Sequence, residues 1–160
     1  MLPFYVMVGA ILIARGIGAI AWEPLDDWKI ATRVGLAVMF VFTGGAHFSP
    51  RTRGDLIGMV PPQLPSPAAL VTFTGIAELA GAVGLLLPGL ARWAAYGLML
   101  LLVAMFPANI RAARTGHRIA GRPHTAMTIR LPLQLFWIVL LWWSALGSGA
   151  SPDTPQSPGP

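Results

Sequence analysis

Long runs of hydrophobic residues, separated by short polar segments, dominate the chain. Five runs are close to the length of about 20 helical residues that crosses a hydrocarbon layer about 30 Å thick. The expected helices cover residues 2–22, 31–48, 68–87, 92–110 and 129–146. This pattern predicts an all-α integral membrane helical bundle, formed as a single domain by residues 1–147. Residues 148–160 are rich in Pro and Ser, have no apolar face, and are expected to be disordered.

The composition agrees with this pattern and excludes several kinds of chemistry. Hydrophobic residues make up 55% of the 160 residues and charged residues 11%, whereas soluble domains carry roughly 25% charged residues. The chain contains no Cys. Disulfides, Cys-ligated zinc and iron–sulfur clusters are therefore excluded within it. No two His residues stand at metal-ligand spacing, so no metal site is expected.

The basic residues point to a membrane topology rather than to nucleic-acid binding, because they concentrate in the loops between apolar spans. One expected side of the membrane holds Arg51, Arg53, Arg111, Arg114, Arg118, Arg122 and Arg130. The other side holds only Lys29, Arg33 and Arg92. The positive-inside rule then predicts a multi-pass protein of a bacterial-type plasma membrane, with its N-terminus in the cytoplasm and its C-terminus outside.

Several polar side chains fall inside the expected spans, where each needs a partner or a function because burial in lipid is costly. Glu78 lies near the middle of the third span, and His47 ends the second. Asn109 lies near the inner end of the fourth span, and Arg130 and Gln134 share a face of the fifth. Because the helices alternate in direction, all of these residues fall in the cytoplasmic half. We expect one cytoplasm-facing pocket; the alternative is a set of hydrogen bonds that fixes helix packing.

The surroundings of this pocket can also be predicted. Phe40 and Trp137 are expected to form an apolar base, which suits an amphipathic ligand with a polar head. Residues 49–67 contain Pro residues that prevent one regular helix, and this segment is expected to cover the pocket. Pro107 is expected to kink the fourth helix and free a backbone carbonyl near Val103.

Arg15 is the second charged residue inside an expected span, at a depth similar to that of Glu78. An ion pair between Arg15 and Glu78 is expected, because each charge would reduce the desolvation cost of the other. The alternative is that the long Arg15 side chain reaches a membrane interface.

The segments RVGLAVMFVFTGGAHF, MVPPQLPSP, TGIAELAGAVGLLLPGLARWAA, FPANI and RLPLQ follow one another between residues 33 and 134. Together they resemble the DoxX-like membrane proteins. The resemblance implies a four-helix membrane core, to which the first expected helix is an N-terminal addition. It also implies that His47, Glu78, Asn109 and Gln134 occupy the family's typical polar positions.

For function, the resemblance implies a subunit or scaffold of a membrane complex that is linked to redox chemistry through partner proteins or a bound quinone. A second hypothesis is a subunit that binds a quinone or a lipid-like molecule, with Glu78 and His47 handling protons. A third is a small transporter, which the lack of an internal repeat disfavours. The expected partners are the lipid bilayer and other membrane proteins, and not nucleic acid.

Overall fold

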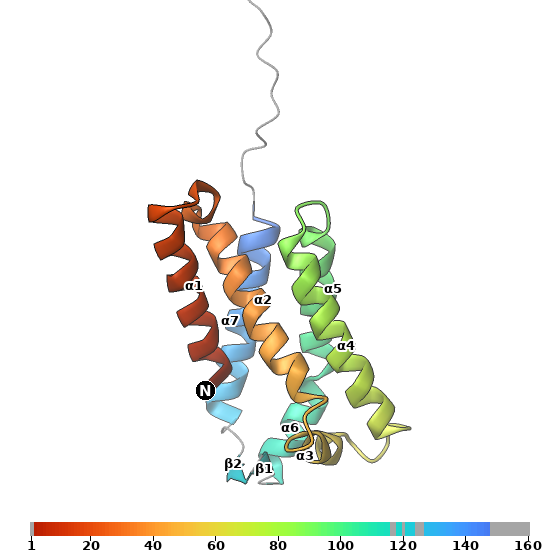
Figure 1. The fold of residues 1–160 in the computed structure, drawn as a ribbon. Coiled ribbons are helices and arrows are strands. Elements are labelled where there is room, and N and C mark those ends of the chain that lie inside the picture. Colours follow the sequence, from red (N-terminus) through yellow and green to blue (C-terminus); the bar gives the residue numbers. More distant parts are fainter. Residues whose placement is uncertain (1, 116–117, 120, 124–126, 148–160) are drawn as a thin grey trace, which may run out of the picture.

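The computed structural model describes residues 2–115, 118–119, 121–123 and 127–147, and the helices stand side by side as a bundle (Figure 1). The first half of the chain forms α1 (Leu2–Ile20), the 3-10 helix η1 (Glu23–Asp26), α2 (Trp28–Ala46), α3 (Arg53–Met59) and α4 (Pro67–Leu86). The second half forms α5 (Ala91–Ala104), α6 (Phe106–Arg114), the strands β1 (Arg118–Ile119) and β2 (Arg122–Pro123), and α7 (Met127–Ala145). The expected all-helical architecture is thus confirmed, apart from one short antiparallel strand pair. The tail that was expected to be disordered lies outside the described residues.

Four helical segments are long and apolar enough to cross a membrane, namely Leu2–Ile20, Trp28–Ala46, Pro67–Leu86 and Ala91–Arg114. The expected count of five such spans is therefore corrected to four for the described residues. In α7 the apolar stretch is the shorter segment Leu131–Ala145.

Four helices form a ring around the main core. Helix α2 packs against α4 and α7, and α5 packs against the same two helices, so α4 and α7 lie diagonally across the ring. Helix α1 lies outside this ring and packs against α2 and η1. The core contains the buried residues Met7, Leu36, Ala37, Met39, Phe40, Ala82, Leu85, Ala95, Leu98, Leu101, Leu102 and Leu141.

The long helices alternate in direction, so the loops gather at two ends of the bundle. The start of α1, α3, α6 and the strand pair lie at one end, here called the α3 end (Figure 1). The segment η1, the α4–α5 turn and the end of α7 lie at the opposite end, here called the η1 end. Helices α5 and α6 are separated at Met105, two residues before Pro107, where the sequence predicts a kink.

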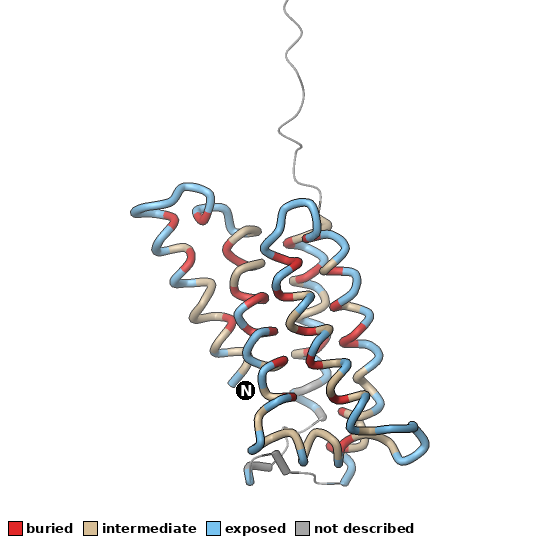
Figure 2. The backbone as a smooth tube through the Cα atoms, turned by 45° about the vertical axis from the view of Figure 1, so that its right-hand side comes forward, coloured by how far each residue is buried: buried red, intermediate tan, exposed pale blue. Residues whose placement is uncertain are grey.

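Many large apolar residues of the helices are exposed. Buried and exposed positions alternate along each helix (Figure 2). Ile13 and Phe73 are each 66% exposed, and Leu100 is 70% exposed. Soluble monomers rarely expose continuous apolar surface on this scale, whereas helices that face lipid do so without cost. The outer surface is therefore consistent with a membrane protein.

Helices α2 and α4 pack closely because glycines stand at their contact. A Cβ atom on Gly75 would lie 2.6 Å from Cβ of His47 and 2.9 Å from Cε2 of Phe48. A Cβ atom on Gly44 would lie 3.0 Å from Cγ of Leu79. Only a residue without a side chain leaves room for His47 at this point, so Gly75 determines where the imidazole lies.

We expect Gly75→Ala to destabilise the protein by about 1–3 kcal/mol, because the added methyl group overpacks the contact with His47. The matched control is Gly45→Ala on α2, where a Cβ atom meets nothing within 4 Å. This control should be neutral, or stabilising by up to about 1 kcal/mol, because Ala is the better helix former. Reversible unfolding in detergent measures both free energies, and equal values for the two variants would contradict the close packing.

Candidate functional site

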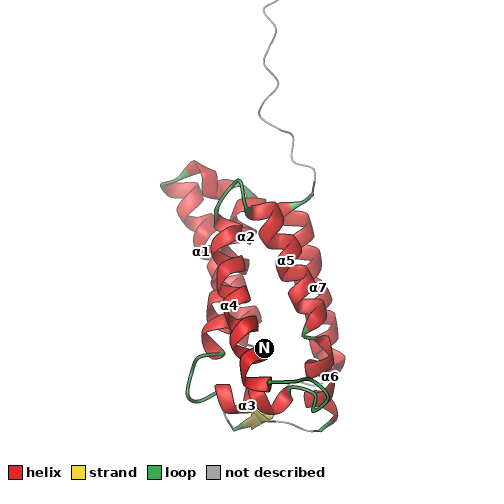
Figure 3. Ribbon diagram, turned by 90° about the vertical axis from the view of Figure 1, so that its right-hand side faces the viewer, coloured by secondary structure: helices red, strands yellow, loops and turns green. Residues whose placement is uncertain are grey.

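A cavity of about 510 Å³ lies inside the bundle near its α3 end. It is enclosed by α2, α4, α5, α6, α7 and the start of α1, and it is closed below by α3. The arrangement of these elements can be followed in Figure 3. Most of the cavity wall is apolar and includes Phe40 and Trp137. The polar side chains in the wall are Thr43, His47, Thr52, Thr74, Glu78, Asn109 and Gln134. The structure therefore brings four of the five expected pocket residues to one cavity.

The imidazole of His47 has a fixed orientation at the end of α2. Its Nδ1 lies 2.9 Å from the carbonyl oxygen of Val71 and 3.2 Å from the hydroxyl of Thr74. A carbonyl oxygen only accepts hydrogen bonds, so Nδ1 carries the proton in this contact. Burial lowers the pKa of the His47 imidazole, which favours the neutral ring at pH 7. In the neutral ring Nε2 is then the free acceptor.

Glu78 faces this free nitrogen from the middle of α4. Its Oε1 lies 3.9 Å from Nε2 of His47, and the residue is only 3% exposed. The second carboxyl oxygen, Oε2, is buried and has no hydrogen-bond partner among the described residues. A buried carboxylate beside a neutral imidazole is costly, so the pair is least charged when it holds one proton. The geometry therefore favours a His47–Glu78 pair that holds one proton.

Asn109 and Gln134 form a second polar group in the wall. The Nδ2 of Asn109 donates to Oε1 of Gln134 over 3.4 Å, and Nε2 of Gln134 donates to the carbonyl oxygen of Leu102. This carbonyl belongs to the last turn of α5, just before the interruption at Met105. It stands next to the Val103 carbonyl that the sequence analysis identified. A backbone carbonyl beside the interruption thus provides a partner for a buried amide.

One further polar atom in the cavity wall was not identified from the sequence. The indole Nε1 of Trp137 is buried and has no hydrogen-bond partner among the described residues. An aromatic residue in an apolar helix predicts packing, and nothing in the pattern shows that its N–H stays unpaired. Trp137 and Glu78 belong to α7 and α4, which lie diagonally across the ring. Two unpartnered polar atoms therefore belong to opposite walls of the cavity.

The segment between α2 and α4 closes the α3 end of the cavity, as the sequence predicts. Leu56, Met59 and Val60 line the cavity from this side. Two arginines hold the segment in place. Arg53 donates to the carbonyl oxygen of His47 and to the hydroxyl of Thr72, over 3.0 Å and 2.9 Å.

The second arginine, Arg111 of α6, donates to the carbonyl oxygens of Gly58, over 2.8 Å, and Val60. The positions of both arginines in the sequence indicate only the membrane topology, because hydrogen bonds to distant carbonyl groups leave no pattern along the chain. Arg130, expected at the edge of the pocket, belongs to α7, but its side chain lies outside the described residues.

The expected Arg15–Glu78 ion pair is wrong. Nη1 of Arg15 lies 2.6 Å from Oδ1 of Asp26, and the guanidinium stands 4.5 Å from the centre of the Trp28 ring. The chain folds back through η1 directly after α1, and this brings Asp26 within reach of Arg15. Glu78 belongs instead to the wall of the cavity, next to His47.

A double-mutant cycle distinguishes these two pairings. Arg15→Met and Asp26→Asn should show a coupling energy of about 0.2–1 kcal/mol, the range for a partly exposed ion pair. Arg15→Met and Glu78→Gln should be additive, because the two side chains share no partner. Unfolding free energies of the single and double variants give both couplings. A clear coupling for Arg15 with Glu78, and none with Asp26, would reverse the assignment.

Comparison with known proteins identifies one family. The family described as "Domain of unknown function (DUF8561)" matches residues 36–145 of the chain. The match begins within α2 and ends with α7, so it contains His47, Glu78, Asn109 and Gln134 and leaves out α1. No curated protein and no solved structure matches the chain.

Proposed function

The chain belongs to the DUF8561 family, whose description states no activity, so we propose its function from the geometry alone. We propose that it is an integral membrane protein that binds an amphipathic small molecule in the cavity. The observation that carries this proposal is the unpartnered Oε2 of Glu78 in a mostly apolar wall. A buried acceptor without a partner costs free energy comparable to a lost hydrogen bond. A ligand that forms a hydrogen bond with this oxygen removes that cost, either as a donor to the carboxylate or as an acceptor from the protonated acid.

The unpartnered atoms also indicate the chemistry of the ligand's head. Trp137 offers an N–H donor on one wall, so the head needs an acceptor on that side. On the opposite wall the carboxyl group of Glu78 donates when it is protonated and accepts when it is ionised, so the head meets a group there that can do either. A small head with polar atoms on two opposite edges fits both walls, and the remaining apolar wall fits a hydrophobic body.

A quinone is one molecule of this class, and the DoxX-like resemblance led to the same expectation. One quinone carbonyl would accept a hydrogen bond from Nε1 of Trp137, and the other would accept one from the protonated carboxyl group of Glu78. When bound, a quinone would supply the electron transfer that the side chains of this chain do not. The role of a subunit in a redox-linked membrane complex stays a prediction from the sequence.

The membrane topology forms part of this proposal. Arg51, Arg53, Arg111 and Arg114 belong to the elements and loops at the α3 end, whereas Lys29, Arg33 and Arg92 belong to those at the η1 end (Figure 1). The excess of basic residues puts the α3 end and the start of α1 in the cytoplasm. We infer that α7, whose apolar stretch Leu131–Ala145 is shorter, crosses the membrane as a fifth helix, so that its end lies outside. The cavity then lies nearer the cytoplasmic interface.

Reporter fusions test this topology. Alkaline phosphatase fused after the C-terminus should be active, because that end reaches the oxidising side where the enzyme folds. The same reporter inserted in the loop at Gln63, near the α3 end, should be inactive and serves as the control. Activity at Gln63 together with inactivity at the C-terminus would invert the proposed orientation.

Trp137→Phe tests ligand binding without breaking any hydrogen bond within the described part of the protein. The variant keeps the aromatic ring but removes the unpartnered N–H, so retention of the bound molecule should fall about three- to tenfold while stability is unchanged. The matched control is Trp142→Phe on the same helix, at a side chain that is 57% exposed. Native mass spectrometry in mild detergent, followed by extraction of the retained molecule, measures the occupancy. If the wild-type protein retains no small molecule, or if all three proteins retain the same amount, the proposal is wrong.

A further inference from the structure

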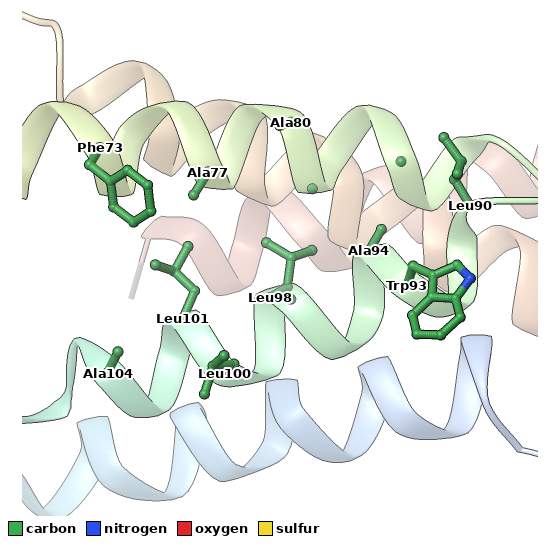
Figure 4. A pocket seen from close by; sticks show the side chains of 13 residues that line it. Phe73, Ala77, Ala80, Leu90, Trp93, Ala94, Leu98, Leu100, Leu101 and Ala104 are labelled. Atoms are coloured by element: carbon green, nitrogen blue, oxygen red, sulfur yellow. The ribbon is translucent and has the colours of Figure 1, made fainter.

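A second hollow lies on the outer surface, between α4 and α5 (Figure 4). This groove has a volume of about 540 Å³, and its lining side chains are apolar. Phe73 stands at one end, and Leu90 and Trp93 stand at the other (Figure 4). Small residues leave the space between the two helices, namely Ala77, Ala80, Gly81, Gly84, Ala94 and Gly97.

The groove and the inner cavity adjoin each other. Phe73, Leu101 and Ala104 line both of them, two from α5 and one from α4. The two hollows therefore border the same three side chains, and the groove extends from there toward the η1 end. A molecule that occupied both hollows would pass these side chains.

The cavity supplies the observation that points to a ligand. Oε2 of Glu78, a residue that is 3% exposed, lacks a partner in the wall of the space that adjoins the groove. The polar atoms all belong to the cavity, and the groove has an apolar lining. The two hollows thus match the two halves of one amphipathic molecule.

We propose that the α4–α5 groove holds the apolar tail of the molecule whose polar head binds in the cavity, so that the ligand is an amphiphile with a single long chain. This inference rests on the proposed function. From Phe73 to Gly84 the groove follows 11 helical steps of α4, which at 1.5 Å each is a length of about 16 Å. A tail of this length extends across about half of the hydrocarbon layer.

The groove selects the tail by shape rather than by hydrophobicity. A tail that leaves the bilayer for the groove gains little from the hydrophobic effect, because lipid chains are as apolar as the groove itself. What differs is packing: the small residues leave a channel between two helices, and the side chains of Phe73 and Trp93 limit its length (Figure 4). One chain of matching length fills this channel, whereas a lipid with two chains leaves one of them outside.

Photo-crosslinking locates the tail directly. The probe is 4-dodecylphenol with a diazirine at the end of its tail, whose phenol head provides both a donor and an acceptor. After illumination in detergent, digestion and mass spectrometry map the labelled residues. We expect labels on α4 and α5 around Leu90 and Trp93, and we expect an excess of 4-ethylphenol to remove them because it occupies the cavity alone.

A variant whose side chain fills the groove gives the decisive test of the tail assignment. At Gly97 a Cβ atom would meet nothing within 4 Å, so Gly97→Leu enters the groove without disturbing the fold. Groove labelling should fall about tenfold, because overpacking by a side chain of this size weakens binding by roughly this factor. Gly16→Leu on α1 is the matched control, since its Cβ atom also meets nothing within 4 Å, and its labelling should be unchanged.

The outcomes separate the tail from the head. The tail assignment would be wrong if the labels were spread over α1, α2 and α4 and Gly97→Leu did not reduce them. The proposed function would remain intact in that case if Trp137→Phe still weakened binding of the probe. A probe that 4-ethylphenol never displaces would overturn both. The alternative occupant of the groove is a second copy of this chain. Because the chain has no Cys, a disulfide-linked dimer of Gly97→Cys would show that copy in the groove and exclude the tail.

Discussion

The close contact of α2 with α4 at Gly44 and Gly75 is the constraint on which the candidate site depends. It brings His47 against the carbonyl of Val71 and, through the ring, against Glu78. A larger residue at Gly75 would displace the imidazole and separate the two titratable groups. The distance between His47 and Glu78, the single buried carboxyl group of the described bundle, thus depends on the lack of a side chain at Gly75. The cavity forms where α2 and α4 diverge from α6 and α7.

The diagonal position of α4 and α7 in the ring gives the cavity its chemical character. Neighbouring helices would let Glu78 reach Gln134 or Trp137 directly and satisfy its carboxyl group within the protein. Across the diagonal, Gln134 instead satisfies Asn109 and the Leu102 carbonyl, and Glu78 keeps one free oxygen. The amides of Asn109 and Gln134 are therefore paired, whereas each of the two opposite walls keeps one unpartnered polar atom, Oε2 of Glu78 and Nε1 of Trp137, and this supports the proposed binding site.

The sequence predicted the helices and the gathering of His47, Glu78, Asn109 and Gln134, because apolar length and alternating direction determine how far along the bundle each residue lies. The prediction from the sequence failed where the partner of a side chain depends on the face of the helix that carries it, or on the local path of the backbone. Arg15 and Glu78 share a depth, but the turn through η1 gives Arg15 a nearer carboxylate in Asp26. The unpaired N–H of Trp137 and the carbonyl contacts of Arg53 and Arg111 could not be predicted, since each depends on the three-dimensional path of the backbone.

The two arginines at the α3 end bind mostly to backbone oxygens, and this has a consequence for how the site can change. A carbonyl group is present whatever residue carries it, so the hold of Arg111 on Gly58 and Val60 does not depend on the side chains of the covering segment. Leu56 and Met59, which line the cavity, are free to be replaced without releasing the segment. Evolution can therefore reshape the floor of the cavity, and with it the choice of ligand, while the framework that supports that floor stays constant.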